Sequence, residues 1–294
     1  MPSAIVTGAT GGIGYATSEG LARAGLRVVL TGRNREKGEA ALARLKKAVP
    51  MADARFELLD VADLAAVAEF AANWQRPVRL LVNNAAVMAY RDRRLTKDGF
   101  EAQIGTNYLG HFALTLRLLP QLLAGEARVV SLSSLAHRRA RIAFDDFNGE
   151  RSYSPWGAYA QSKLAMLMFA RELQRRATER GWKLSSIAAH PGWSATSIVV
   201  NGQGEGLVGR VGQTLFSALA QSAAAGALPI LYAALDASAK PGGYYGPANW
   251  GETRGPSAPA RVMPQAQDQA ACERLWTLSE QLTGVKLEDA VADL

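Results

Sequence analysis

The sequence predicts an α/β fold, a doubly wound parallel sheet of about seven strands flanked by helices, because short apolar runs alternate with helical stretches. The runs are rich in Val, Ile and Leu and do not alternate with polar residues, which is typical of strands that are buried on both faces. Six strands can be placed from such runs, at residues 4–7, 26–30, 55–59, 79–82, 128–132 and 184–189.

Helical segments connect these strands. The first is expected to end near Ala24, and the second, rich in Ala, Lys and Glu, near Ala48. Asp63 is the predicted N-cap of the helix after the third strand, because its carboxylate can accept hydrogen bonds from the free backbone N–H groups of the first helical turn. A long helical stretch separates the fourth and fifth strands. A final amphipathic helix is expected to end near Leu282.

The length of 294 residues and an apolar fraction of 48% suit one large globular domain, and we assign residues 1–294 to it. Three parts break the strand–helix rhythm: a basic loop at about 135–155, a Gly- and Ser-rich substrate loop or lid at about 191–220, and a C-terminal extension at about 247–294. The single cysteine, Cys272, fits a reducing compartment, so a cytoplasmic protein is expected. The longest apolar runs are too short to predict a membrane span.

The net charge of +7 is concentrated in two basic clusters, at residues 91–94 and 137–141. Neither cluster contains the interleaved aromatic residues of a nucleic-acid binder, so no nucleic-acid partner is expected. Two explanations of these basic clusters remain open: they are solvated loops, or they attract a phosphorylated cofactor. His111 and His190 are expected in the core or at helix ends and His137 in a loop or pocket wall, and their spacing predicts no metal site.

A glycine-rich turn leaves the first strand and opens a helix, at residues 7–14. Glycines allow the sharp turn and the close approach of a ligand, and the free N–H groups of the helix N-terminus suit a pyrophosphate. This arrangement in a strand–turn–helix unit predicts a dinucleotide site. The residues expected to contact the cofactor here are Gly8, Thr10, Gly12, Ile13 and Gly14.

The end of the second strand predicts which dinucleotide binds. An NAD site places a carboxylate there to accept from the ribose 2′-hydroxyl, whereas this chain has Thr31-Gly32-Arg33-Asn34. The Arg33 guanidinium can hold a 2′-phosphate through paired hydrogen bonds, with Asn34 beside it. NADP(H) is therefore the predicted cofactor.

Tyr159 and Lys163 lie four residues apart on a predicted helix, which puts them one turn apart on the same face. A neighbouring ammonium favours the phenolate, so the pKa of the tyrosine is expected to fall from about 10. Alone this spacing is common on solvated helices; together with the cofactor turn it predicts a proton donor and acceptor.

These motifs resemble, in content and order from residue 3 to about 246, those of the short-chain dehydrogenases/reductases, which implies a single-domain Rossmann-type fold. The glycine turn is similar to the family's TGxxxGxG motif, residues 83–86 to its NNAG motif with Ala86 in place of glycine, residues 159–163 to its YxxxK motif, and residues 191–196 to its PGxxxT segment. The further cofactor contacts that the resemblance implies are Asp60, Val61, Asn84, Ala85, Tyr159, Lys163, Pro191, Gly192, Trp193 and Thr196.

The resemblance also implies a mechanism. Tyr159 donates or accepts the proton of a substrate oxygen, Ser134 holds that oxygen, and Lys163 lowers the pKa of Tyr159 and holds the nicotinamide ribose. Asn107 completes the catalytic set through a water that links Lys163 to solvent. Ser134 is preferred to Ser133 because neighbouring strand residues face opposite sides.

The stretch between Ser134 and Tyr159 is long and resembles that of the branch containing retinol dehydrogenases and protochlorophyllide reductases. This implies a small-molecule carbonyl or alcohol substrate that is bulky and apolar. Met88, Leu135, Trp156 and Trp193 are the candidate pocket walls, and Trp250 is either a further wall or a packing residue.

Two alternatives stay open. A cofactor-binding redox sensor without turnover would share the glycine turn, although it would have no need of the Ser134, Tyr159 and Lys163 set. The family often forms dimers or tetramers through the tyrosine-bearing helix, so the apolar stretch from Leu164 to Phe169 is either the contact of a homodimer or homotetramer or ordinary core.

Overall fold

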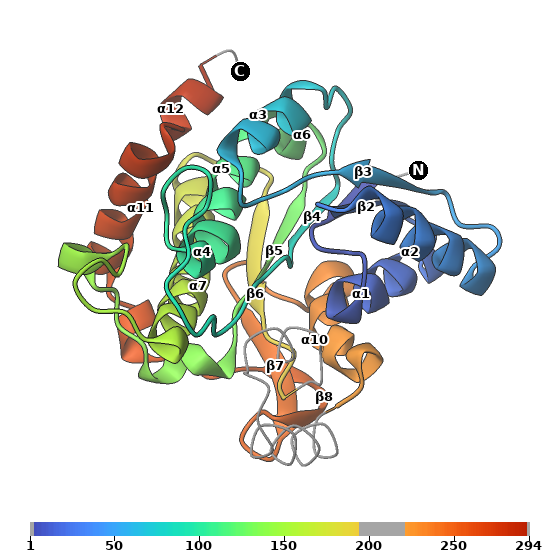
Figure 1. Cartoon of the computed structure of the whole chain (residues 1–294). Coiled ribbons are helices and arrows are strands. Elements are labelled where there is room, and N and C mark those ends of the chain that lie inside the picture. Colours follow the sequence, from blue (N-terminus) through green and yellow to red (C-terminus); the bar gives the residue numbers. More distant parts are fainter. Residues whose placement is uncertain (1–2, 194–220, 293–294) are drawn as a thin grey trace.

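The computed structural model describes residues 3–193 and 221–292 (Figure 1). Within them, eight strands form one sheet in the order β3-β2-β1-β4-β5-β6-β7-β8. All neighbouring pairs are parallel except β7 and β8, which are antiparallel. The strands are β1 (Ser3–Val6), β2 (Arg27–Gly32), β3 (Ala54–Leu58), β4 (Leu80–Asn83), β5 (Arg128–Leu132), β6 (Ser185–Ala189), β7 (Tyr244–Asn249) and β8 (Arg254–Pro259).

The predicted fold class is confirmed, but the sheet has one strand more than the expected seven. The last two strands, β7 and β8, form a hairpin in a segment from which the sequence predicted no strand. Prolines such as Pro247 and Pro256 carry no N–H for a ladder, so they disfavour strands except at a sheet edge. Pro256 lies on the edge strand β8, and Pro247 lies beyond Tyr244 and Tyr245, the residues of β7 that pair with β6. The register of the hairpin is irregular between Pro247 and Asn249.

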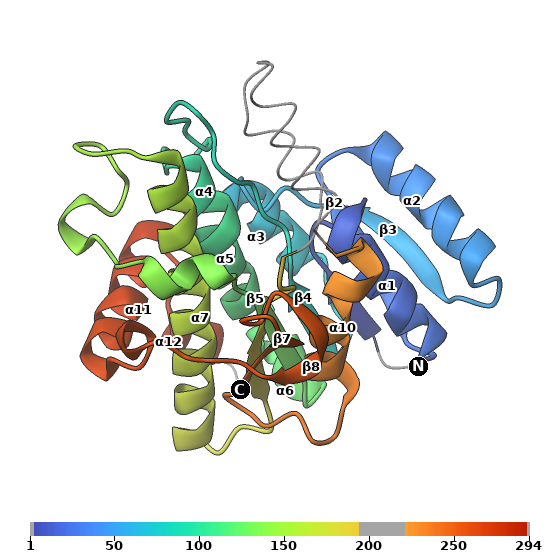
Figure 2. The same cartoon turned by 90° about the horizontal axis from the view of Figure 1, so that it is seen from below.

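Helices cover both faces of the sheet, as Figures 1 and 2 show. One face is covered by α1, α2 and α10, and the other by α3, α5 and α7. The helical elements are α1 (Gly12–Arg23), α2 (Arg35–Ala48), α3 (Leu64–Ala72), α4 (Ala102–Ile104), the π-helical turn η1 (Gly105–Leu109), α5 (Gly110–Arg117), α6 (Leu119–Ala124), the 3₁₀ turns η2 (Leu135–Arg139) and η3 (Phe144–Asp146), α7 (Pro155–Glu179), α10 (Ala223–Leu235), the 3₁₀ turn η4 (Pro264–Ala266), α11 (Gln269–Thr283) and α12 (Leu287–Ala290).

The sheet separates two hydrophobic layers because side chains alternate along each strand. Ile5 and Val29 belong to the layer beneath α3, α5 and α7, while Val6 and Leu30 belong to the layer beneath α1 and α10. The predicted cap of α3 is confirmed, since the Asp63 carboxylate accepts from the backbone N–H groups of Ala65 and Ala66 at 3.1 and 3.2 Å.

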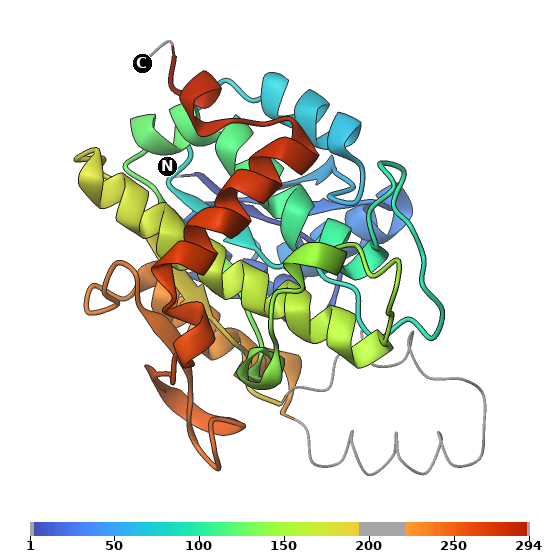
Figure 3. The same ribbon diagram turned by 90° about the vertical axis from the view of Figure 1, so that its left-hand side faces the viewer.

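The C-terminal helix α11 lies across the outer side of α7 (Figure 3). Trp276 of α11 stacks on Phe169 with ring centres 5.9 Å apart and meets Phe112 edge-on at 5.1 Å. Leu164 to Phe169 are therefore buried within a single chain, which confirms core packing for this stretch.

The segment from 135 to 155, expected as a loop, contains the two 3₁₀ turns η2 and η3, which are too short to leave a periodic pattern in the sequence. No helix in the described part of the chain is long and apolar enough to cross a membrane. The connections from β1 and from β4 run to opposite sides of the sheet, so a crevice is expected where the carboxyl ends of these two strands meet.

Candidate active site

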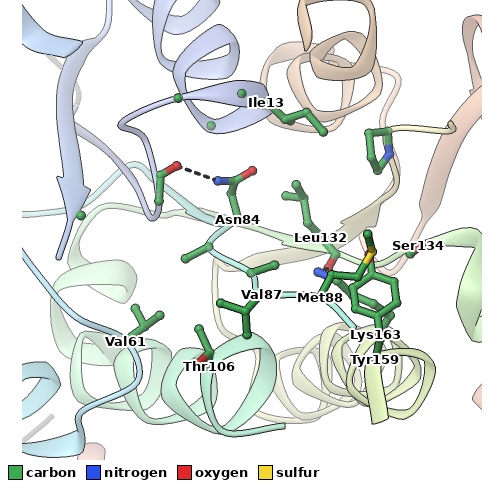
Figure 4. A pocket seen from close by; sticks show the side chains of 18 of the residues that line it. Ile13, Val61, Asn84, Val87, Met88, Thr106, Leu132, Ser134, Tyr159 and Lys163 are labelled. Atoms are coloured by element: carbon green, nitrogen blue, oxygen red, sulfur yellow. Dashed lines mark hydrogen bonds between the residues drawn. The ribbon is translucent and has the colours of Figure 1, made fainter. Parts of the chain in front are cut away.

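A cavity of about 740 Å³ opens at the carboxyl ends of the strands (Figure 4). It runs from the turn after β1 and the end of β2, past the segment after β4, to the N-terminal part of α7. It is lined by Gly8, Thr10, Gly11, Gly12, Ile13, Gly14, Gly32, Arg33, Asn34, Lys37, Leu59, Asp60, Val61, Asn84, Ala85, Ala86, Val87, Met88, Tyr90, Thr106, Leu132, Ser133, Ser134, Leu135, Ala136, Trp156, Tyr159, Lys163, Pro191, Gly192 and Trp193.

The glycine turn forms one end of the cavity and packs tightly on the segment after β4. Gly8 has a φ of +63°, and a Cβ there would lie 2.8 Å from the Ala85 Cα. A Cβ on Gly14 would lie 2.4 Å from both the Gly8 carbonyl and the Asn84 side chain. Only glycine fits these two positions. No side chain caps the N-terminus of α1, so its backbone N–H groups remain donors for an anionic ligand.

Charge at this end favours an anion. Among the described lining residues Asp60 is the only carboxylate, whereas Arg33, Lys37 and Lys163 are basic. Arg33 follows β2 at the surface and reaches the rim of the cavity. The Asn34 side chain accepts from the Lys37 backbone N–H at 2.8 Å and caps α2, so its oxygen already has a structural role that the sequence analysis missed.

The other end of the cavity brings together Ser134, Tyr159 and Lys163, which come from the end of β5 and from α7 (Figure 4). Nζ of Lys163 donates to the Leu132 backbone carbonyl at 3.0 Å and lies 5.9 Å from the centre of the Tyr159 ring. The Tyr159 side chain is half-buried and Lys163 is buried. A proton donor and a buried cation therefore share one wall.

The pKa of Tyr159 differs from the expectation. Burial of the phenol raises its pKa above the ordinary value, and only the hydrogen bond from Ser134 opposes this rise. Burial also lowers the pKa of Lys163 to about 8. The expected lowering of the Tyr159 pKa by the ammonium is therefore wrong, and desolvation, which the sequence does not reveal, sets the direction of the shift.

The two serines after β5 have different surroundings. The buried Ser133 donates from its hydroxyl to the Lys163 backbone carbonyl at 2.8 Å and so holds α7 on the sheet. Ser134 lies beside Tyr159 at the cavity, and its hydroxyl accepts from the Ala136 backbone N–H at 3.3 Å. Both serines line the cavity, but the Ser133 hydroxyl hydrogen is already donated within the protein, so Ser134 is the better placed to bind a ligand.

Asn107 does not line the cavity but holds its wall from behind. It lies buried in the π-helical turn η1. Its amide donates to the Val87 carbonyl and to Ser162 Oγ, both at 2.9 Å, and accepts from the Val87 N–H at 2.8 Å. Both amide hydrogens are therefore used within the protein, and the side chain fixes Val87 against α7. Single π-turns of this kind are frequent at functional sites.

The four expected pocket walls, Met88, Leu135, Trp156 and Trp193, all line the cavity. Trp156 meets Tyr159 edge-on, with ring centres 6.2 Å apart. Trp250 is not a wall: it is 80% exposed in the β7–β8 turn, with a φ of +54°.

Several wall residues were missed by the sequence analysis, among them Leu59, Val87, Tyr90, Thr106, Leu132 and Ala136. No motif marks these residues, because their place depends on how the segments after β3 and β4 pack against β5, η1 and η2. Thr196 and most of the expected substrate loop lie outside the described residues. Among the residues the structure describes, no cluster of His, Cys, Asp and Glu could hold a metal ion.

Comparison with known proteins agrees with this geometry. A family model described as short chain dehydrogenase matches residues 2–203. The chain is 39% identical over 290 residues to a mouse polyprenol dehydrogenase, covering 96% of this chain and 83% of that protein. It is 35% identical over 292 residues to human retinol dehydrogenase 12, covering 97% and 87%. A crystal structure of an uncharacterized protein from Mycobacterium paratuberculosis superposes with a TM-score of 0.81 at 38% identity, covering 98% of this chain and 95% of the other.

Proposed function

Because the chain belongs to the short-chain dehydrogenase family, we propose that this oxidoreductase uses NADP(H) to interconvert a carbonyl and an alcohol of a bulky apolar substrate. The observation that carries the proposal is the shared cavity. Its glycine turn and basic rim suit a phosphorylated dinucleotide, and Ser134, Tyr159 and Lys163 stand at its other end.

The two ends of the cavity have the shape and the polar groups that a nicotinamide dinucleotide requires. The close contacts of Gly8 and Gly14 leave a groove above the uncapped N-terminus of α1, where backbone N–H groups can bind a pyrophosphate. At the far end, the buried Lys163 ammonium suits ribose hydroxyls. When bound, the cofactor supplies or accepts the hydride.

The chain's own residues then handle the proton. In carbonyl reduction the Tyr159 hydroxyl donates its proton to the substrate oxygen, and in alcohol oxidation the phenolate accepts it. The Ser134 hydroxyl donates a hydrogen bond to the same oxygen and stabilises the charge that develops there. The raised pKa of Tyr159 keeps the phenol protonated at neutral pH, which suits reduction.

The preference for NADP(H) is supported by Arg33 and Lys37. Both line the cavity next to the end of β2, where an NAD site would have a carboxylate. A guanidinium and an ammonium at that point attract a 2′-phosphate, and the guanidinium can bind it through two parallel hydrogen bonds.

The substrate class is supported by the walls and by the relatives. Met88, Leu135, Trp156 and Trp193 give the reacting end an apolar and aromatic surface. The relatives named polyprenol dehydrogenase and retinol dehydrogenase 12 are named after apolar alcohols.

The test is the loss of NADPH fluorescence in the presence of a panel of apolar aldehydes, ketones and quinones. We expect turnover with at least one long-chain or cyclic apolar aldehyde and a much slower reaction with NADH. NADPH binding without turnover on any compound would contradict the proposal and would support the redox-sensor alternative.

A further inference from the structure

His111 is a fully buried histidine of α5 that lies outside the cavity yet contacts two of the segments that build it. Its Nε2 atom lies 2.8 Å from Thr7 Oγ1, at the start of the glycine turn. Its Nδ1 atom lies 3.1 Å from the backbone carbonyl of Asn107, in the π-helical turn. The imidazole thus connects the cofactor turn with the turn that carries a catalytic candidate.

The other hydrogen bonds of the Thr7 hydroxyl show whether it donates to His111 or accepts from it. Its buried hydroxyl oxygen also accepts the backbone N–H groups of Asn84 and Ala85, at 2.8 and 2.9 Å. A hydroxyl has two acceptor lone pairs and one donor hydrogen, so both lone pairs of Thr7 Oγ1 are used by these amides. The single hydrogen has two acceptors in range, the Val82 backbone carbonyl at 3.3 Å and His111 Nε2 at 2.8 Å, and Nε2 is the closer of the two.

The hydrogen-bond partners of its two ring nitrogens determine the tautomer of His111. A backbone carbonyl can only accept, so Nδ1 must carry the hydrogen that is donated to Asn107. Nε2 is then unprotonated and accepts the Thr7 hydroxyl hydrogen. The opposite tautomer would give Thr7 Oγ1 a third donor and would place two lone pairs against each other at Asn107.

The ionisation of His111 is consistent with this arrangement. Burial, assisted by the nearby charge of Lys163, lowers the pKa of His111 to about 4. The imidazole is therefore neutral at physiological pH, and its Nε2 lone pair is available to Thr7.

Helix α5 and the π-turn before it touch the cavity wall at three places. His111 reaches Thr7, which holds Asn84 and Ala85. Asn107 holds Val87 through two hydrogen bonds, one from the Val87 N–H and one to the Val87 carbonyl, and donates a third to Ser162. The third contact is backbone packing: Gly110 lies so close to Val61 that a Cβ would come within 1.8 Å of the Val61 carbonyl.

We propose that His111 is a positioning residue that orders the cofactor turn and the segment after β4 for NADP(H) binding, by accepting the hydroxyl hydrogen of Thr7. This inference rests on the proposed cofactor site. His111 does not line the cavity and acts through Thr7.

Two substitutions of His111 separate its two hydrogen bonds. His111→Gln places an amide oxygen near the position of Nε2 and keeps an acceptor for Thr7. His111→Asn places an amide near the position of Nδ1 and keeps only the bond to Asn107. Two substitutions of Thr7 form the corresponding pair. Thr7→Ser keeps the hydroxyl group that hydrogen-bonds to His111, and Thr7→Val removes it.

The measured quantity is the Kd of NADPH from fluorescence titration, with thermal unfolding of each variant alongside. We expect His111→Asn to weaken NADPH binding about ten-fold, the effect of one lost buried hydrogen bond. Thr7→Val should weaken it at least as much, because this change also removes the acceptor of the Asn84 and Ala85 amides. His111→Gln and Thr7→Ser should stay within about three-fold of the parent. The double variant Thr7→Val/His111→Asn should be no weaker than Thr7→Val, because the two residues act as one unit.

The inference is overturned if His111→Asn lowers thermal stability while binding NADPH as tightly as the parent, because that is the signature of plain packing. Additive effects in the double variant would overturn it as well. If the unsubstituted protein itself fails to bind NADPH, the proposed function is wrong instead. Long-range proton–nitrogen NMR determines the tautomer of His111 independently of cofactor binding, and the assignment is simple because the chain has only three histidines. We expect Nε2 of His111 to be unprotonated. A protonated Nε2 would show that His111 does not accept the Thr7 hydroxyl hydrogen.

Discussion

Nζ of Lys163 lies 5.9 Å from the centre of the Tyr159 ring, and both groups are desolvated by the same wall of the cavity. Desolvation disfavours charge, so it shifts the two pKa values in opposite directions. The pKa of the phenol rises and that of the ammonium falls to about 8.

The first prediction concerns pH. Lys163 is protonated below its pKa of about 8 and neutral above it, while Tyr159 stays protonated across the neutral range. We expect kcat for carbonyl reduction to be level around pH 7 and to fall as the pH rises through about 8. Lys163→Arg keeps its charge to much higher pH, so an arginine variant that folds should lose this alkaline decline, whatever its absolute rate. An identical decline in both proteins would assign the ionisation to another group.

The second prediction concerns cofactor choice. Arg33→Asp replaces the guanidinium with a carboxylate that repels a 2′-phosphate, so the ratio of kcat/KM for NADPH over NADH should fall by roughly ten- to a hundred-fold. Arg35→Asp is the matched control, because it changes the charge by the same amount. Arg35 is exposed and does not line the cavity. Equal changes in the two variants would point to a general field effect in place of a specific contact.

The third prediction separates the neighbouring serines. Ser134→Ala removes a donor to the substrate oxygen and should lower kcat about 10²-fold with little change in melting temperature. Ser133→Ala breaks the buried hydrogen bond to the Lys163 carbonyl and should lower the melting temperature instead. Steady-state kinetics and thermal unfolding of both variants check this, and a reversed pattern would move the catalytic role to Ser133.

The fourth prediction concerns the C-terminal helix. Trp276 is buried between α11 and α7 against Phe112 and Phe169, so Trp276→Ala should lower the free energy of unfolding by about 3–5 kcal/mol. The control is Trp250→Ala, which removes the same side chain from an exposed turn and should change stability little. Urea unfolding of the two variants measures the difference, and equal losses would mean that α11 does not anchor on α7 as described.

The sequence predicts the parts of the molecule that depend on local chemistry. Gly8 has a positive φ, and a Cβ on Gly14 would lie 2.4 Å from the Gly8 carbonyl six residues earlier, so both positions are part of a local turn that leaves a readable motif. The spacing of Tyr159 and Lys163 follows from one turn of helix. The fold class follows in the same way from buried strands alternating with helices.

The rest depends on contacts between distant segments. The β7–β8 hairpin forms at an edge where Pro247 is tolerated, which composition alone argues against. The pKa of Tyr159 is set by burial, and burial is decided by the whole cavity. The link between His111 and Thr7 joins residues 104 positions apart and leaves no pattern in either segment.

Tyr159→Phe tests whether the phenol is the proton donor to the substrate oxygen, because it removes only the hydroxyl group. The variant should bind NADPH with an unchanged Kd, since phenylalanine keeps the ring and its contact with Trp156. Its kcat should fall about 10²- to 10⁴-fold. If the variant keeps more than about a tenth of the parent kcat, Tyr159 is not the proton donor.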